Sequence, residues 1–184
     1  MLIVLVIVVA VIALWAIGIF NGLVGLRNQV ENAWKQIDVQ LKRRHDLIPN
    51  LVDTVKGMMK FEQDTLTKVM EARAKAVSAH TVREKGAAET ELTGSLARLL
   101  AVFENYPDLK SNQNVLKLQE ELTTTENQIG FTRQHYNDLV MRFNAQQQTF
   151  PANMIAGTLG FKTAEYLEIA TAEREVPRVD LSTG

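Results

Sequence analysis

The sequence predicts an all-α protein, in which an N-terminal transmembrane helix continues into an elongated antiparallel four-helix bundle. Three observations predict this class. The 184 residues include only four proline and ten glycine residues and are rich in helix-forming side chains. The first 26 residues carry no charge and are almost wholly apolar. Beyond them, apolar residues recur at alternating spacings of three and four, as on one face of a helix.

Charge and composition exclude several classes of function. All charged residues lie after residue 26, and the whole chain has a net charge of −1. That balance lacks the basic excess typical of nucleic-acid-binding proteins, so we expect no nucleic-acid partner. The chain has no cysteine, which excludes disulfides, thiolate metal sites and cysteine nucleophiles.

Residues 1–26 are predicted to form a transmembrane anchor with the lipid bilayer as its partner. About 20 apolar residues have the length that crosses ~30 Å of hydrocarbon as a helix. Trp15 and Phe20 suit the interface at the far end. A cleaved signal peptide is the alternative, but no Lys or Arg precedes the apolar run and residues 13–16 form a poor cleavage site.

Basic residues flank only the C-terminal side of this anchor. They are Arg27, Lys35, Lys42, Arg43 and Arg44. Cytoplasmic flanks of membrane helices carry an excess of Lys and Arg. We therefore expect a single-pass protein whose N-terminus lies outside and whose bundle lies in the cytoplasm.

Gly18, Gly22 and Gly25 place three small residues near one face of the anchor. Small residues at this spacing let membrane helices approach one another closely. We therefore predict an anchor packing face through which copies of the chain associate. The alternative is a flexible junction between the anchor and the bundle.

The bundle is expected over residues 27–173, and its first helix continues directly from the anchor. One stripe stays in phase through Val30, Trp34, Ile37, Leu41, Arg44, Ile48, Leu51, Val55 and Met58. Pro49 lies inside this helix, where it removes the backbone hydrogen bond to the carbonyl of His45. The uninterrupted stripe favours a kink at Pro49 over a break and a new helix.

The second and third helices follow from turn and capping signals. The second begins near Glu62 and ends at Pro107, either as one helix with a weak middle or as two joined pieces. The third begins at Ser111 or Asn112, either of which can cap it, and ends at Phe150.

The fourth helix is predicted over residues 152–172, with a possible bend at Gly157 or Gly160. Its apolar side comprises Ile155, Leu159, Tyr166 and Ile169. Residues 174–184 are expected to form an extended tail. Short connections between amphipathic helices favour an antiparallel bundle.

Three charged residues occupy stripe positions: Arg44 on the first helix, and Glu126 and Arg133 on the third. Charged groups on a core face are normally paired. In this scheme the first and third helices run parallel, facing each other diagonally or as neighbours. We expect a structural polar network with Glu126 between the two arginines, which fixes the register of the helices. The alternative is that these side chains extend from the edge of the stripe into water.

Several motifs resemble those of the LemA family, over nearly the whole chain. The most specific is Asn32-Ala33-Trp34 followed by IDVQLKRRHDLIPNLV at 37–52. The others are ENYPDLK at 104–110, Arg133-x-x-Tyr136-Asn137, Phe143-Asn144 and Phe150-Pro151. The resemblance implies a single-pass bacterial inner-membrane protein with a cytoplasmic helical bundle and no known catalytic activity. Magnetosome-membrane proteins similar to the family imply a membrane-organising role.

The sequence offers little support for catalysis or metal binding. His45 and Asp46 point about 100° apart on a helix, so they do not form a base and its orienting partner. His45, His80 and His135 have neither HExxH nor Glu-x-x-His spacing, and the chain has no glycine-rich phosphate loop or GxSxG motif. We expect no catalytic residue, cofactor or metal site, and we expect each histidine to be solvated or to cap a helix.

The predicted function is that of a non-enzymatic, membrane-anchored helical scaffold. It would form homo-oligomers and organise the membrane or a protein partner that the sequence does not name. The second hypothesis is a monomeric adaptor or regulatory subunit that docks a partner enzyme through its bundle. An enzyme, and a secreted bundle released by signal cleavage, are the third and fourth hypotheses. Oligomeric state separates the first two.

Overall fold

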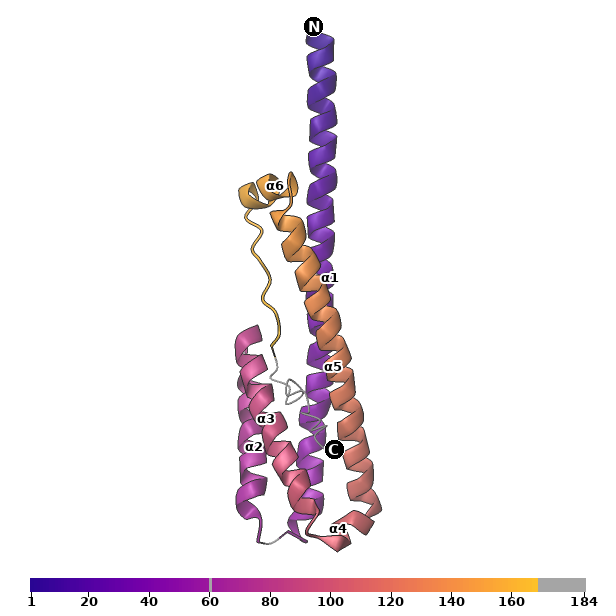
Figure 1. Cartoon of the computed structure of the whole chain (residues 1–184), viewed down its shortest axis with the longest axis vertical. Helices are drawn as coiled ribbons and strands as arrows, with labels where there is room; N and C mark the ends of the chain where they lie inside the picture. The colour runs from indigo at the N-terminus through magenta and orange to yellow at the C-terminus, as the bar shows by residue number, and fades with distance from the viewer. Residues whose placement is uncertain (60, 169–184) are drawn as a thin grey trace, which may run out of the picture.

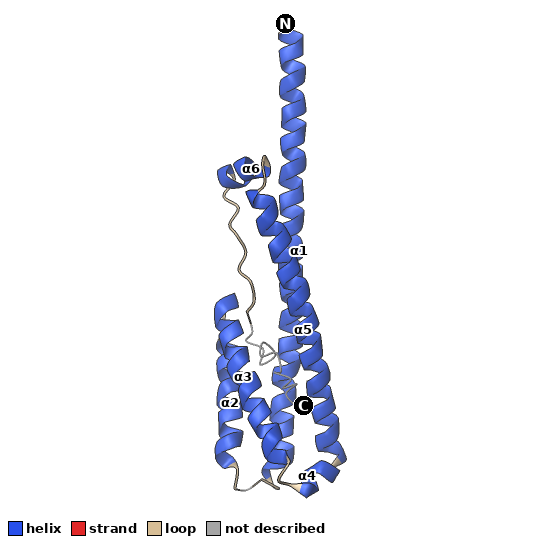
Figure 2. Ribbon diagram, viewed as in Figure 1, coloured by secondary structure: helices blue, strands red, loops and turns tan. Residues whose placement is uncertain are grey.

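The protein forms six helices, shown in Figures 1 and 2, in a computed structural model that describes residues 1–59 and 61–168. These two ranges contain no strand. The predicted all-α class and the long apolar N-terminal helix are therefore confirmed. The predicted tail at 174–184 lies outside the described residues.

Helix α1 (Leu2–Lys56) carries both the anchor and the first bundle helix without interruption. Its 55 residues make it about 80 Å long at ~1.5 Å per residue. Its N-terminal part has a mean hydropathy of 3.3, which is enough for a membrane span by length and composition. Because α1 continues through Pro49, the alternative of a break there is wrong. The kink itself stays a prediction.

The predicted second helix is two helices that form an antiparallel hairpin, α2 (Gln63–Ser78) and α3 (Val82–Phe103). Of the two alternatives, the joined pieces are therefore correct. Thr81 separates them, since its side chain accepts a hydrogen bond from the backbone N–H of Glu84 while the Glu84 carboxylate accepts one from the backbone of Thr81. This reciprocal cap starts a new helix where the apolar pattern weakens.

Helix α4 (Pro107–Ser111) is a short connection that leads into α5 (Gln113–Gln148). The side chain of Asn112 caps α5, as predicted, by accepting from the backbone N–H groups of Asn114 and Val115. The α2–α3 hairpin adds one chain reversal to the predicted topology. For that reason α5 packs directly against α1 and runs antiparallel to it, not parallel (Figure 1).

The predicted fourth helix is wrong beyond its first two turns. Helix α6 (Ala152–Thr158) is short, and residues 161–168 form an extended segment without helix or strand. Gly160 lies between them with φ +70°, a conformation that other residues adopt only with strain. Leu159 and Tyr166, expected on the buried side, are exposed. Ile169 and the rest of the predicted helix lie outside the described residues.

Two cores follow one another along the molecule, a proximal core next to the anchor and a distal core at the far end. Because residues 161–168 are not helical, the bundle is not made of the four helices that the sequence predicted. The distal core comprises Ile48, Leu51, Val52, Val55, Met59, Leu66, Val69, Ala72, Ala76, Leu92, Leu96, Leu99, Phe103, Leu109, Val115 and Leu122, from α1 to α5. The proximal core comprises Val30, Ala33, Ile37, Leu41, Ile129, Tyr136, Leu139, Val140, Phe143 and Leu167. In the proximal core the extended segment packs beside α1 and α5 (Figure 1).

Candidate functional site

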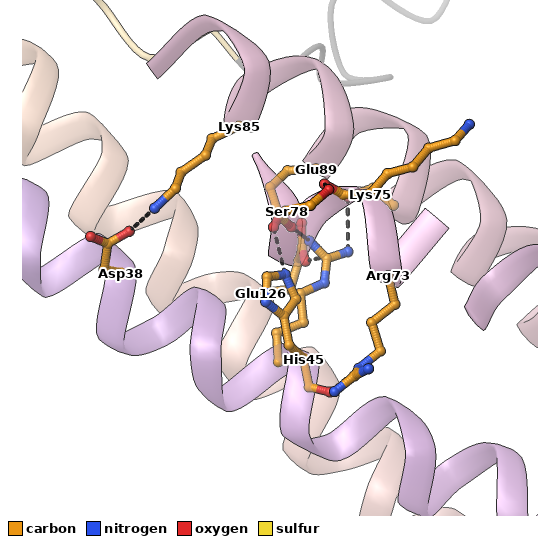
Figure 3. A network of polar contacts seen from close by, with 10 residues as sticks. Asp38, His45, Arg73, Lys75, Ser78, Lys85, Glu89 and Glu126 are labelled. Carbon is orange, nitrogen blue, oxygen red and sulfur yellow. Dashed lines mark hydrogen bonds and ion pairs between the residues drawn. The ribbon is translucent and has the colours of Figure 1, made fainter. Parts of the chain in front are cut away.

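A buried polar cluster joins α1 to α3 near the junction of the two cores. Glu89, whose side chain is 1% exposed, accepts from Arg44 Nη1 at 3.2 Å through one carboxylate oxygen. Its other oxygen lies 2.7 Å from Nε2 of His45. Figure 3 shows Glu89 and His45 pointing toward one another from their two helices. Both oxygens of a fully buried carboxylate are thus satisfied, as its burial requires.

The guanidinium of Arg44 also reaches two residues besides Glu89. Its Nη2 donates to Thr93 Oγ1 at 2.9 Å and lies 3.1 Å from Glu126 Oε2. The structure therefore brings Glu126 to Arg44, although the Glu126 side chain is 45% exposed. Arg133 lies two turns further along α5 and is half-buried. A role of Arg44, Glu126 and Arg133 in fixing the register stays a prediction.

The carbonyl that Pro49 leaves without a partner is bound from another helix. Proline has no N–H, so the carbonyl oxygen of His45, one turn earlier, loses its intrahelical donor. The Nε of Arg73 on α2 donates to this oxygen at 2.6 Å (Figure 3). The run RRHDLIPN therefore attaches α1 to the hairpin three times: through the side chains of Arg44 and His45 to α3, and through a backbone carbonyl to α2.

Two features of this cluster were not predicted. The expectation that each histidine is solvated or caps a helix is wrong for His45, which is buried against Glu89. Glu89 itself was missed because the 80–90 region appeared to lack a pattern. The signal was present: Glu89 lies three residues before Leu92, in phase with the buried Leu96, Leu99 and Phe103. A carboxylate on this stripe requires a basic partner.

A cavity of about 350 Å³ lies beside the cluster, between α1 and the hairpin. Four of its charged lining residues form two pairs: Lys42 donates to Asp46 at 2.6 Å, and Lys85 pairs with Asp38. The hydrogen bond from Lys42 holds the pKa of the Asp46 carboxyl below its ordinary value. The contacts of Arg44, His45 and Arg73 join α1 to both helices of the hairpin, so the arrangement is that of a structural clasp.

A second constellation holds the extended segment against α5. The side-chain amide of Asn144 donates to the carbonyl of Ala164 at 2.9 Å and accepts from its N–H at 2.8 Å. Asn137, two turns earlier, makes the same pair of bonds with Leu167, at 3.1 and 2.9 Å. Each amide supplies a donor and an acceptor to an otherwise unpaired backbone residue. The motif residues Asn137 and Asn144 therefore act as clamps, a role that their sequence pattern did not reveal.

The clamped segment fits closely against its surroundings. Leu167 is buried in the proximal core, and the Tyr136 hydroxyl donates to the carbonyl of Glu165 at 2.8 Å. Burial, and to a lesser extent the charge of Glu165, raise the pKa of the Tyr136 phenol. On α3, a Cβ added to Gly86 would lie 2.4 Å from the carbonyl oxygen of Glu168. Glycine is therefore the residue that allows α3 to approach the segment.

The predicted anchor face is open. A Cβ added to Gly18, Gly22 or Gly25 would meet nothing within 4 Å, so the chain itself does not use this face. The anchor is not wholly separate from the domain, because Leu23 is fully buried and the ring of Phe20 lies 6.0 Å from that of Phe161. The division of the chain at residue 26 stays a prediction.

A family model covers the residues of both constellations. The model of the LemA family matches residues 33–181, which include the RRHDLIPN run and both asparagine clamps. The chain belongs to the LemA family. The matched residues cover most of the rod but not residues 1–32. The apolar N-terminal helix and the relatives together mark the chain as a membrane-associated protein.

Three relatives of the chain are bacterial proteins. The chain is 29% identical over 169 residues to Protein LemA of Metamycoplasma hominis, covering 91% of this chain and 75% of that protein. It is 25% identical to Magnetosome protein MamQ 2 of Paramagnetospirillum magneticum and 21% identical to Magnetosome protein MamQ of Magnetospirillum gryphiswaldense, covering 81% and 80% of this chain. The chain spans 64% of the length of each magnetosome protein.

Proposed function

We propose that this LemA-family protein is a non-enzymatic scaffold of the bacterial inner membrane, which self-associates through its anchor and organises membrane or protein partners with its cytoplasmic rod. The observation that carries the proposal is the continuity of α1. One helix of 55 residues contains both the anchor and the spine of the rod. With no interruption between them, contacts made by the anchors set the mutual orientation of the rods.

The open glycine face supports association at the anchor. Between membrane helices, small residues permit close backbone approach and extensive van der Waals contact. Gly18 and Gly22 lie one turn apart on an apolar stretch where the chain's own atoms leave space for a neighbour. The relatives named as magnetosome proteins support the proposal, because the resemblance to magnetosome-membrane proteins implies a membrane-organising role.

The buried cluster supports a non-enzymatic role. Its titratable groups bind one another across the helix interfaces, and both oxygens of Glu89 are occupied. Among the described residues, no group of three or more His, Asp or Glu side chains is arranged to hold a metal ion. Under the proposal, the cluster keeps the rod stiff and in register.

Self-association is tested by replacing Gly18 and Gly22 with isoleucine in the full-length protein. Its mass in detergent is then measured by light scattering on a sizing column. We expect the unaltered protein to form a discrete oligomer and the double variant to dissociate to a monomer, because the branched side chains prevent close approach. The fold should be unaffected, since neither added Cβ meets another part of the chain.

The matched control replaces Ala13 and Ala16 with isoleucine. These alanines lie roughly 120–180° around the helix from the two glycines, at about 100° per residue. Their replacement tests whether larger side chains elsewhere on the anchor have the same effect. A monomeric unaltered protein, or equal dissociation of both double variants, would refute association through the glycine face.

A monomeric adaptor remains the second candidate function, and exposed apolar side chains on the rod favour it. Val39 on α1 and Phe131 and Met141 on α5 are all exposed. A partner that docks there would cover them. If the unaltered protein is monomeric, cross-linking from these positions in cells is the experiment that would identify such a partner.

A further inference from the structure

Helix α6 and the residues that flank it expose three large apolar side chains, while the helix buries two alanines. Ala152 and Ala156 face the protein and are 3% exposed. Met154 is 65% exposed, Phe150, just before the helix, is 78% exposed, and Leu159, at its end, is also exposed. In water this orientation leaves three large apolar side chains exposed and forgoes the stabilisation that their burial would give.

The position of α6 explains this inversion. Figure 1 shows α6 lying across the direction of α1, beside it and partway along its length. The ring of Phe161, just after α6, lies 6.0 Å from Phe20 and 6.4 Å from Phe143. Residues 2–20 of α1 extend about 28 Å at ~1.5 Å per residue, close to the ~30 Å thickness of the hydrocarbon core. With that stretch in the bilayer, α6 lies at the membrane interface.

The charged residues near α6 also indicate where the membrane interface lies. No charged residue occurs from Phe143 to Phe161, nor from Met1 to Leu26. The first charged residue beyond each uncharged stretch is basic: Arg27, Arg142 and Lys162. The Arg27 guanidinium lies 5.7 Å from the centre of the Phe161 ring. Arg142 and Lys162 are the chain neighbours of Phe143 and Phe161, whose ring centres lie 6.4 Å apart.

We propose that residues 150–159 form an interfacial foot, in which Phe150, Met154 and Leu159 insert into the lipid headgroup and upper acyl region beside the anchor. Arg27, Arg142 and Lys162 lie at the adjacent anionic headgroups. Apolar side chains below a ring of cations are the arrangement by which short helices bind a bilayer surface. The foot gives the rod a second membrane contact, which holds it at a fixed angle. This inference rests on the membrane location of the protein, but it does not require self-association.

The test measures the depth of single spin labels in full-length protein reconstituted into vesicles of phosphatidylcholine and phosphatidylglycerol. The native chain has no cysteine, so each label site is created by one substitution, Phe150→Cys or Met154→Cys. The matched control is Phe131→Cys, another phenylalanine that is 68% exposed but lies on the rod. Collisions with oxygen, which concentrates in lipid, are compared with collisions with a water-soluble nickel complex.

We expect labels at 150 and 154 to show an oxygen-to-nickel collision ratio several-fold higher than the label at 131. Equal, water-like ratios at all three positions would overturn the proposal. Low collision rates with both reagents at 150 and 154 would also overturn it, because they would show that another protein surface covers the foot. Labelled protein without vesicles, in a detergent-free amphipathic polymer, shows whether the ratio depends on lipid.

Discussion

Glu89 is the residue on which the polar cluster depends most. It is the fully buried counter-ion of Arg44, and it also binds the ring of His45. Glu126, although it was predicted to occupy this place, is half exposed and holds Arg44 from the solvent side. A charge without its partner in a buried site is far more costly than the same loss at a surface.

The first prediction concerns Glu89→Gln, which keeps the shape of the side chain but removes its charge. We expect it to destabilise the rod by roughly 3–5 kcal/mol, because Arg44 loses its buried counter-ion. The measurement is hydrogen exchange of α2 and α3 amides in the full-length protein in detergent. Glu91→Gln, two residues away, removes an exposed pair with Lys75 and should cost no more than ~1 kcal/mol. Similar losses in both variants would contradict the role assigned to Glu89.

The second prediction concerns Tyr136 and alkaline pH. The pKa of this phenol is raised in the folded protein, so the stability it contributes is present below its unfolded pKa of about 10 and is lost as the pH rises through the folded value. We expect the protection of the 163–168 amides, measured relative to their intrinsic base-catalysed exchange, to fall above about pH 10. Tyr136→Phe should lose about 1 kcal/mol at neutral pH, with the hydrogen bond to Glu165.

Tyr136→Phe is also the control for the loss of protection at alkaline pH. Without the phenol, the variant should lack the part of the pH dependence that titration of Tyr136 causes. A Tyr136→Phe protein whose segment is released over the same pH range as the unaltered protein would show that another group is responsible.

At the scale of elements, the sequence predicted helices well where one stripe stayed in phase. The path of α1, the cap at Asn112 and the start of α2 near Glu62 follow from periodicity and capping alone. Periodicity could not predict the extended segment, because its backbone hydrogen bonds come from asparagine side chains on α5. Such long-range partners leave no local pattern in residues 161–168.

The polar cluster was predictable only in part, for a related reason. Arg44 and Glu126 stand out because charge interrupts a strong apolar stripe. Glu89 lies at the weak N-terminal end of the α3 stripe, so it is recognised as a core position only when the stripe is traced back from Leu92 and Leu96. The capture of the His45 carbonyl by Arg73 follows from Pro49 only once α2 is known to lie beside it.

The third prediction tests the contact between α3 and the extended segment. In Gly86→Ala, the added Cβ would approach the carbonyl oxygen of Glu168 to 2.4 Å, so the backbone must move. We expect faster amide exchange over 164–168 and weaker protection of Leu167. Gly94→Ala on the same helix is the control, because its Cβ meets nothing within 4 Å. It should stabilise α3 by up to ~1 kcal/mol through helix propensity. Equal exchange in both variants would show that the segment does not pack on Gly86 in solution.

At the scale of the molecule, α1 sets how the parts are held together. It is the one element that contributes to the anchor, the proximal core, the distal core and the polar cluster. The hairpin packs on its far half, α5 packs along it through both cores, and the extended segment and α6 support it near the predicted membrane surface (Figure 1). Motion of the anchor is therefore transmitted along the rod without a flexible joint.

The fourth prediction is the orientation of the whole molecule in the membrane. Topology is decided during insertion, before the rod folds, so Arg44 counts as a basic residue then even though it is paired later. Arg27, Lys35, Lys42 and Arg43 also lie within about 20 residues of the span. We expect Phe131→Cys to resist a membrane-impermeant maleimide in intact cells and to react after permeabilisation. Leu2→Cys should react in intact cells. The reverse pattern would place the rod outside, and it would require that the basic flank had crossed the membrane against the bias that Lys and Arg normally impose.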